Sequence, residues 1–470
     1  MRVKHSPGPL LQAATLSVLL GLTTVLLGSA VAAPSPPQRP ESQQEYWARY
    51  DRRDWAGAIQ EARRLVEQAN ANTKQRPREL AEALTLLGNA LLSSGEKMTA
   101  ELTYREALRI TELQGNSSDP ALLDPLRGLG YTLALLDRHE EAIPYLERAL
   151  LVVRRTHGLF DLGQQGLLRQ LANSLAQTGR LADGAKQMLY LQRVGERAYG
   201  ERDPRMAPLL CVIGDWYVDT GNFMLGRDRY RNAIRIVEHK LGKQDPALVQ
   251  PLRGLARSYV QEIYFFAYGY QPLQDRTMID PINLEPRGMN PKYISSDGER
   301  ALQRALSILD ARPDTTSALL TDTLIQLGDW YQVKHQPEKA LVYYKRAALL
   351  ATNADDTSAE ADAVPLSFPV RVYYPVPPLA LRNRQLPRGQ VDERFVEVQF
   401  TVTDQGNVED ARVVDQNGTQ RQVSETLEAI RASRYRPKFV NGEPVATEGV
   451  VVREVFRMRK QDDDSEQGKS

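Results

Sequence analysis

A leucine-glycine pair returns along this chain at a fixed spacing, and this spacing constrains the fold more than any other feature. It occurs at Leu87-Gly88 and again at Leu129-Gly130, 42 residues later. The same positions then hold Leu171-Ala172, Ile213-Gly214 and Leu255-Ala256 at further steps of 42, and Leu327-Gly328 after a step of 72. Such a period is typical of stacked supersecondary units, because one unit is too small to bury its own apolar face.

Each unit carries the apolar pattern of two helices. In the unit that follows Asp119, apolar residues recur three and four positions apart on both halves, with a turn at 137–139 between them. An Asp-Pro pair begins several units, where the carboxylate can cap free backbone N–H groups and proline loses no hydrogen bond. We therefore expect seven units over 45–352, the first of them imperfect at about 43–72.

The step of 72 residues predicts an insertion at about 261–297. This stretch begins with Tyr264, Phe265, Phe266, Tyr268 and Tyr270 and continues with four prolines, which exclude a long helix. Long loops inside compact arrays are often functional. Two interpretations stay open: the aromatic residues pack on neighbouring helices, or they form a loop that binds a partner.

The units resemble the tetratricopeptide repeat (TPR). Gly88, Leu91, Ala100, Tyr104 and Ala107 fall at the spacing of that family, as do the equivalent residues of two later units. The period of 42 and the Asp-Pro pairs are similar to the longer repeats of kinesin light chains. The resemblance implies a mostly α fold, with a right-handed TPR α-solenoid that binds proteins or peptides in its concave groove.

In that resemblance the groove is lined by the residues three before and one after the glycine position. Our candidate partner-binding residues there are Asn89, Arg127, Tyr131, Arg169, Asn173, Asp215, Arg253 and Arg257. Arg169/Asn173 and Arg253/Arg257 are similar to parts of the clamp with which some co-chaperone TPR proteins hold a peptide carboxylate. Asp215 stands where that clamp has an asparagine. It either opposes such a ligand or forms a plain salt bridge with Arg257 or Arg169.

The composition changes after Leu350. The stretch 353–372 is acidic and then rich in proline, and we interpret it as a linker. Alternating residues at 394–403 and 408–414 predict two strands around a turn at 404–407, followed by a helix at 420–433 and a third strand at 450–456. The expected order of this α+β segment is β-β-α-β.

Residues 373–460 resemble the C-terminal domain of the TonB family. The matching residues come in order along the chain: Tyr374-Pro375, Phe400-Thr401-Val402 with Gly406, Asn417-Gly418, Arg434-Tyr435-Arg436-Pro437 and Asn441-Gly442-Glu443-Pro444. The resemblance implies a periplasmic domain that binds outer-membrane transporters, in part by pairing a peptide strand with its sheet edge. The family's anchor histidine and its long spacer are absent here, which argues against energy transduction.

The last strand is our candidate edge for capturing a partner. Val450, Val452, Arg453 and Val455 are the candidate contact residues. We expect Arg453, Glu454 and Arg457 to discourage self-pairing by their charge. The alternative is that the proline-rich segment or a second copy of the domain covers this edge.

The N-terminal residues have the pattern of a targeting segment. Basic residues precede an apolar run at 16–28, and Ala30-Val31-Ala32 offers the small residues that a signal peptidase recognises. We expect a signal peptide at 1–33, a linker at 34–44 and a disordered tail at 461–470. An uncleaved anchor in the inner membrane is the alternative, because the apolar run can be counted from Leu10. Export without a disulfide fits the bacterial periplasm.

The composition argues against several classes of function. A net charge of +1 lacks the basic excess of a nucleic-acid-binding surface. The single cysteine, Cys211, allows no intramolecular disulfide and is expected to be buried. No phosphate-binding loop, metal-ligand motif or nucleophile elbow is present, so we expect neither an enzyme nor a cofactor or metal site. The expected function is a periplasmic protein-binding scaffold, with an anchored energy transducer as the alternative.

Overall fold

The computed structural model describes residues 40–71, 76–115, 118–268, 295–312, 317–352, 366–381 and 391–459. The chain divides into two units, Met1–Glu41 and Ser42–Ser470. The expected signal peptide and C-terminal tail lie outside the described residues. Among the described residues, no helix has the length and apolar character needed to cross a membrane.

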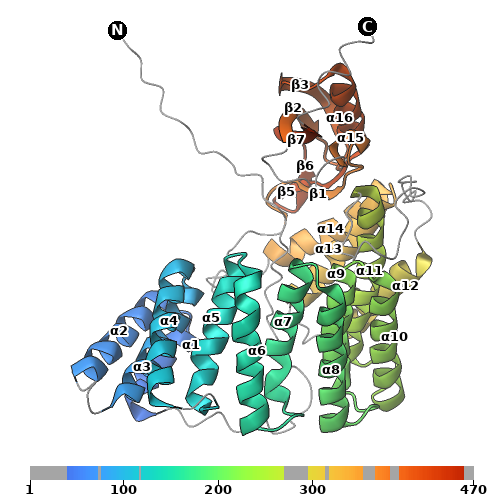
Figure 1. Ribbon diagram of the computed structural model, residues 1–470. Coiled ribbons are helices and arrows are strands. Elements are labelled where there is room, and N and C mark those ends of the chain that lie inside the picture. Colours follow the sequence, from blue (N-terminus) through green and yellow to red (C-terminus); the bar gives the residue numbers. More distant parts are fainter. Residues whose placement is uncertain are drawn as a thin grey trace, which may run out of the picture. The chain divides into compact units, whose positions relative to one another are not determined.

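Seven helix pairs form the repeat array within the described part of the chain (Figure 1). They are α1 (Gln44–Asp51) and α2 (Trp55–Ala71), α3 (Pro77–Ser93) and α4 (Lys97–Gln114), α5 (Leu123–Leu135) and α6 (His139–Thr156), α7 (Gln165–Gln177) and α8 (Leu181–Tyr199), α9 (Met206–Asp219) and α10 (Phe223–Lys240), α11 (Val249–Tyr268) and α12 (Ser296–Asp310), and α13 (Ser317–Val333) and α14 (Pro337–Thr352). Each helix packs against the next along the chain. The predicted mostly α repeat fold is confirmed.

The aspartates between units cap the chain where it turns into the next helix. Asp119 Oδ1 accepts a hydrogen bond from the N–H of Ala121 at 2.9 Å, and Asp245 Oδ1 accepts one from Ala247 at 2.9 Å. In both places a short 3-10 turn comes first, η2 (Pro120–Leu122) and η4 (Pro246–Leu248), and the α-helix follows directly. The predicted capping is therefore present, with a 3-10 turn at the start of these units.

The glycine positions allow helices to approach closely around a buried tyrosine. The ring of Tyr104 is fully buried on α4. A Cβ at Gly88 of the same unit, or at Gly128 of the next unit, would overlap this ring. Tyr230 is held in the same way between Gly214 and the following unit. The leucine-glycine period thus marks where each tyrosine packs between two units. Cys211 is buried in this core, as expected.

The predicted insertion at about 261–297 begins as helix. Helix α11 runs to Tyr268, so its last two turns belong to this stretch, and residues 269–294 lie outside the described part. The hydroxyl of Tyr264 donates a hydrogen bond to the carbonyl oxygen of Val372. At least this aromatic residue is engaged within the chain.

The C-terminal domain combines one three-stranded sheet with short paired strands (Figure 1). Its elements are β1 (Val370–Tyr373), α15 (Pro378–Leu381), β2 (Val391–Val402), β3 (Val408–Gln416), α16 (Gln420–Ala432), β4 (Arg434–Arg436), β5 (Lys438–Val440), β6 (Glu443–Val445) and β7 (Thr447–Arg459). The antiparallel sheet has the order β3-β2-β7, while β1 pairs with β4 and β5 with β6. The predicted order β-β-α-β corresponds to β2, β3, α16 and β7.

Helix α16 covers one face of this sheet. Thr419 begins it with a capping box, in which Thr419 and Gln422 bond each other's backbone N–H groups. Val423 and Ile430 are buried, and α16 packs against β2 and β3 while α15 packs against β7. The core between these layers contains alternate residues of β2, namely Val396, Val398, Phe400 and Val402. Phe456 of β7 also belongs to it. The strand β1 lies partly in the stretch that we expected to be a linker.

Candidate functional site

The residue after the glycine position binds a tyrosine of its own unit in three of the repeats. The Tyr104 hydroxyl donates to Asn89 Oδ1 at 2.6 Å, and the Tyr230 hydroxyl donates to Asp215 Oδ1 at 2.6 Å. In the last unit, the Tyr344 hydroxyl donates to Asp329 Oδ1 at 2.7 Å. Two candidate groove residues, Asn89 and Asp215, are thus tied to the buried tyrosines behind them.

Asp215 also forms a salt bridge with the following unit. Arg257 of the following unit lies 2.7 Å from Asp215 Oδ1 and 3.3 Å from Asp219 Oδ1. Burial lowers the pKa of the Arg257 guanidinium, but the two carboxylates outweigh this effect and the net shift is upward. Of the two interpretations of Asp215, the structure therefore shows the salt bridge with Arg257.

Arg253 is also engaged with its neighbours. Its Nε donates to Gln326 Oε1 at 3.1 Å, and its Nη2 lies 3.7 Å from Asp322 Oδ2. Burial lowers the pKa of this guanidinium more than Asp322 raises it. The pair Arg253/Arg257, which resembled one part of a carboxylate clamp, thus has acidic or amide partners within the array.

The other groove candidates lie on the earlier helices α5 and α7. Arg127 forms an exposed salt bridge with Asp124 at 2.6 Å. Tyr131 lies in the field of Arg127 and Arg169, but burial dominates and raises the pKa of its hydroxyl. Asn173 is exposed one turn after Arg169 on α7. These earlier candidate positions carry basic and amide groups, whereas the later ones belong to an ion-pair network within the array.

The second candidate surface is the edge of the sheet. In the order β3-β2-β7, the strand β7 pairs with β2 along one side, and no described strand pairs with its other side. Val450 and Val452 pack against the domain core, whereas Arg453 and Val455 lie on the opposite face. The four candidate edge residues therefore share one strand but divide between its two faces.

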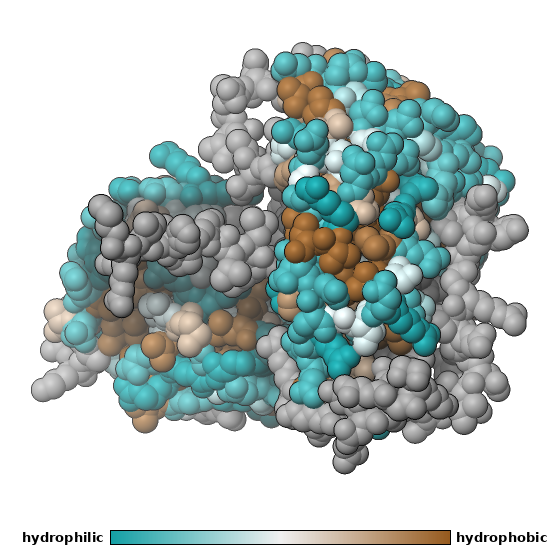
Figure 2. Space-filling model, turned by 90° about the horizontal axis from the view of Figure 1, so that it is seen from above, coloured by the Kyte–Doolittle hydropathy of each residue, from teal (hydrophilic) through white to brown (hydrophobic). Residues whose placement is uncertain are grey.

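The face of the sheet opposite α16 combines apolar and paired charged side chains. Figure 2 views the molecule from above, and its surface there is largely hydrophilic with separate hydrophobic areas. On β7, Val451 and Val455 are 48% and 38% exposed. Between them, the Arg453 guanidinium lies 3.5 Å from the ring centroid of Phe395 and 3.7 Å from Glu397. A partner strand beside β7 would meet valine and arginine in alternation on this face.

One expectation for this strand is wrong. Glu454 does not stand in solvent as a deterrent to self-pairing, because it is 8% exposed and accepts a hydrogen bond from the Tyr374 hydroxyl at 2.7 Å. The reason is the alternation of the strand, which places residue 454 on the same face as Val452 and Phe456. Burial, with Glu454 beside it, raises the pKa of Tyr374 well above its ordinary value.

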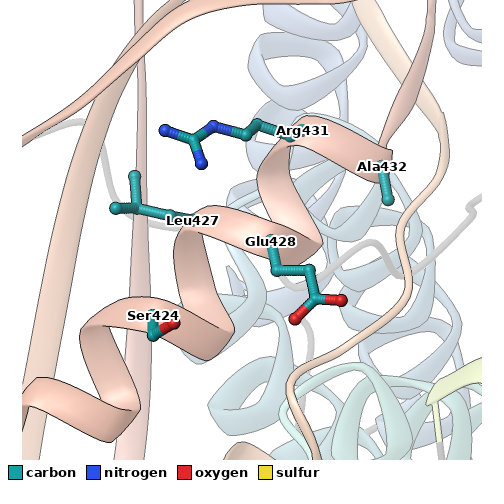
Figure 3. Close-up of a pocket in the computed structure, with 5 residues that line it drawn as sticks. All are labelled: Ser424, Leu427, Glu428, Arg431 and Ala432. Carbon is teal, nitrogen blue, oxygen red and sulfur yellow. The ribbon is translucent and has the colours of Figure 1, made fainter.

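No catalytic arrangement emerges from the described residues. The hollow in Figure 3 lies along α16 alone, where Leu427 and Arg431 point to one side and Glu428 to the other. A hollow lined by one exposed helix lacks the enclosing walls of a small-molecule site. Within the described ranges, no group of three His, Cys, Asp or Glu residues could hold a metal ion.

Two parts of the chain match known protein families. Residues 395–458 match the family described as the Gram-negative bacterial TonB protein C-terminal, and this match begins within β2, includes β3 and α16, and ends near the end of β7. Residues 128–152 match the tetratricopeptide repeat, within α5 and α6. Both are protein-interaction modules, and the first is associated with the bacterial cell envelope. No curated protein is similar to the chain in a direct comparison.

Several solved structures share likeness with the repeat array at low identity. BtubC (BKLC) from P. vanneervenii is 19% identical, with 66% of this chain and 96% of that chain covered and a TM-score of 0.32. A putative kinesin light chain repeat protein from Podosopora anserina is 12% identical, with 50% and 96% covered and a TM-score of 0.36. A tetratricopeptide repeat protein from Parabacteroides merdae is 14% identical, with 67% and 93% covered and a TM-score of 0.39.

The repeat period, the helix pairs and the sheet with its helix agree with the two family matches. The chain thus combines an array of tetratricopeptide-like helix pairs with a C-terminal domain that matches the TonB C-terminal family over residues 395–458.

Proposed function

We propose that this protein is an exported scaffold of the bacterial periplasm that binds two other proteins and catalyses no reaction. The repeat groove holds one partner, and the edge of β7 captures an extended segment of another, such as an outer-membrane transporter or another envelope protein. The side of β7 with which no described strand pairs carries the proposal, because main-chain N–H and C=O groups at a sheet edge can pair with an added strand.

The groove partner would meet the earlier half of the array. Arg169 and Asn173 lie one turn apart on α7, and Arg127 and Tyr131 occupy the same positions on α5. These groups fit a peptide with acidic or carboxylate character. The later half is closed to such a ligand by Asp215 and Asp219, which repel an anion and already hold Arg257.

Site-specific crosslinking in cells tests both surfaces. A photoreactive amino acid at Val455 on β7 is expected to give adducts with a partner, whereas one at Val414 on the opposite edge strand β3 is not. Both valines are exposed, so the pair is matched in accessibility. At the groove, Asn173 is compared with Lys186 on the second helix of the same unit.

Adducts of equal yield at Val414 and Val455 would contradict strand capture at β7. Equal adduct yields at Asn173 and Lys186 would contradict the binding of a partner in the groove.

A further inference from the structure

The interior of the array contains a three-residue motif that joins one unit to the next. The hydroxyl of Tyr230 and the guanidinium of Arg257 both reach the carboxylate of Asp215. Tyr230 belongs to the same unit as Asp215, 15 residues later, while Arg257 comes from the following unit, 42 residues later. The motif therefore connects consecutive units.

The last unit repeats this motif with a residue from the C-terminal domain. Tyr344, 15 residues after Asp329, donates its hydroxyl to Asp329 Oδ1 at 2.7 Å. The arginine is Arg436 on β4, whose Nε lies 3.0 Å from Asp329 Oδ1 and whose Nη2 lies 2.7 Å from Asp329 Oδ2. Arg436 thus occupies the place that an arginine of an eighth unit would have.

The ring of Tyr344 also contacts the C-terminal domain, where an interior tyrosine contacts the next unit. In the interior, the ring of Tyr230 packs against Gly254 of the next unit. The ring of Tyr344 is fully buried and meets Phe439 of β5 edge to face, with 6.3 Å between the ring centroids. An aromatic side chain of the C-terminal domain therefore covers the surface that a further repeat would cover.

Three more contacts surround this junction. Gln332 on α13 donates to the carbonyl oxygen of Gln405 at 2.7 Å, in the turn between β2 and β3. Lys345 on α14 lies 2.6 Å from Glu443 on β6. Tyr264, on the extended end of α11, binds the carbonyl oxygen of Val372 on β1. With Arg436 and Phe439, the junction thus joins helices of the last two units to β1, β4, β5, β6 and the β2–β3 turn.

The charges at the centre of this junction are largely removed from water. The side chains of Arg436 and Asp329 are 12% and 24% exposed. Two parallel N–H···O bonds join the groups, and removal of either partner would leave the other charge buried without its counter-charge. Burial lowers the pKa of Arg436, yet Asp329 and Tyr344 together outweigh this effect and the net shift is upward.

We infer that the C-terminal domain docks on the last repeat in place of an eighth unit and serves as the cap of the array, with the Asp329–Arg436 pair as its main polar contact. Terminal units of repeat arrays need a cap, because their outer face would otherwise be exposed. This role is independent of the proposed partner binding, since its contacts come from β1, β4, β5, β6 and the β2–β3 turn and none of them uses β7.

A cleavable form of the full chain tests the inference. A protease site placed between Thr352 and Leu366 allows the folded protein to be cut between its two parts. The two fragments are expected to co-elute in size-exclusion chromatography after cleavage. Arg436→Gln and Asp329→Asn are each expected to weaken the association by about tenfold or more, because a buried charge loses its partner.

The matched control is Arg257→Gln, which removes the same guanidinium from the interior motif. It is expected to lower the stability of the array but to leave the fragments associated. Circular dichroism of each uncut variant shows whether it is folded, and Asp329→Asn leaves the C-terminal domain unaltered. Separation of the fragments of the unsubstituted protein immediately after cleavage would overturn the inference. An unchanged affinity between the two fragments of Arg436→Gln would also overturn it.

Discussion

At the scale of single residues, the tyrosines at one repeat position serve both packing and polar contacts. Tyr104, Tyr230 and Tyr344 are fully buried, and each hydroxyl reaches the residue that follows a glycine. The spacing of the repeat predicts that these rings are buried. It does not predict the hydroxyl partners, because the acceptor is Asn89 in one unit and an aspartate in the two others.

This difference in acceptor leads to a matched pair of predictions. Tyr230→Phe removes a hydrogen bond to a charged carboxylate and is expected to lower the free energy of unfolding by about 1.5–3 kcal/mol. Tyr104→Phe removes one to the neutral Asn89 and is expected to cost about 0.5–1.5 kcal/mol. Urea denaturation measures both. A larger loss in Tyr104→Phe than in Tyr230→Phe would contradict the assignment of charged and neutral acceptors.

A second residue-scale prediction concerns Ala149, which is fully buried on α6. Ala149→Trp inserts a large side chain where helices pack closely, and it should lower the free energy of unfolding by about 1–3 kcal/mol. Leu151→Trp on the same helix is the control, since Leu151 is exposed. Thermal unfolding of the two variants checks this, and equal midpoints would show that residue 149 is not at a helix interface.

At the scale of elements, long periodic segments could be predicted and short ones could not. The paired helices and the strands β2, β3 and β7 carry enough residues for a period of 3.6 or 2 to be visible. The short strands β4, β5 and β6 span three residues each, too few for any period. Charge alone predicts that Glu454 lies in solvent, whereas strand alternation places it beside Phe456 in the core, and its burial follows the alternation.

The edge strand yields the element-scale prediction. Consecutive N–H groups of a strand point to opposite edges, so of Val452→Pro and Arg453→Pro one removes a donor from the open edge and the other a donor to β2. The variant that loses the donor at the unpaired edge is expected to abolish capture of a partner by the folded protein. The variant that loses the donor to β2 is expected to destabilise the sheet. Circular dichroism and a partner pull-down distinguish them. Full capture by both folded variants would rule out strand addition at β7.

At the scale of the whole molecule, local motifs predict the two modules but not their junction. Gly88 and its equivalents indicate the array, and the Arg434–Arg436 segment with its following proline indicates the C-terminal domain. The Asp329–Arg436 pair joins residues 107 positions apart, so no periodicity reveals it. Asp329 does stand in the same position as Asp215, and that correspondence is the one sequence signal that could have marked it.

The mature N-terminus provides the whole-molecule prediction. Cleavage after Ala32 is expected, because small residues occupy the two positions that a signal peptidase reads. Intact mass of the protein from a periplasmic extract should correspond to a chain that begins at Ala33 or close to it. An intact Met1 in the inner-membrane fraction would instead favour the anchored transducer.

The position of the Asp329–Arg436 pair has a consequence for how a gene of this kind can change in length. A duplication that adds a whole 42-residue unit before α13 leaves Asp329, Tyr344 and their C-terminal partner in place, so the ending of the array is inherited unaltered. An addition after α14 would separate them and require a new terminus. Lineages carrying this architecture should therefore vary in repeat number upstream of the last helix pair, while that pair and the following domain are inherited together.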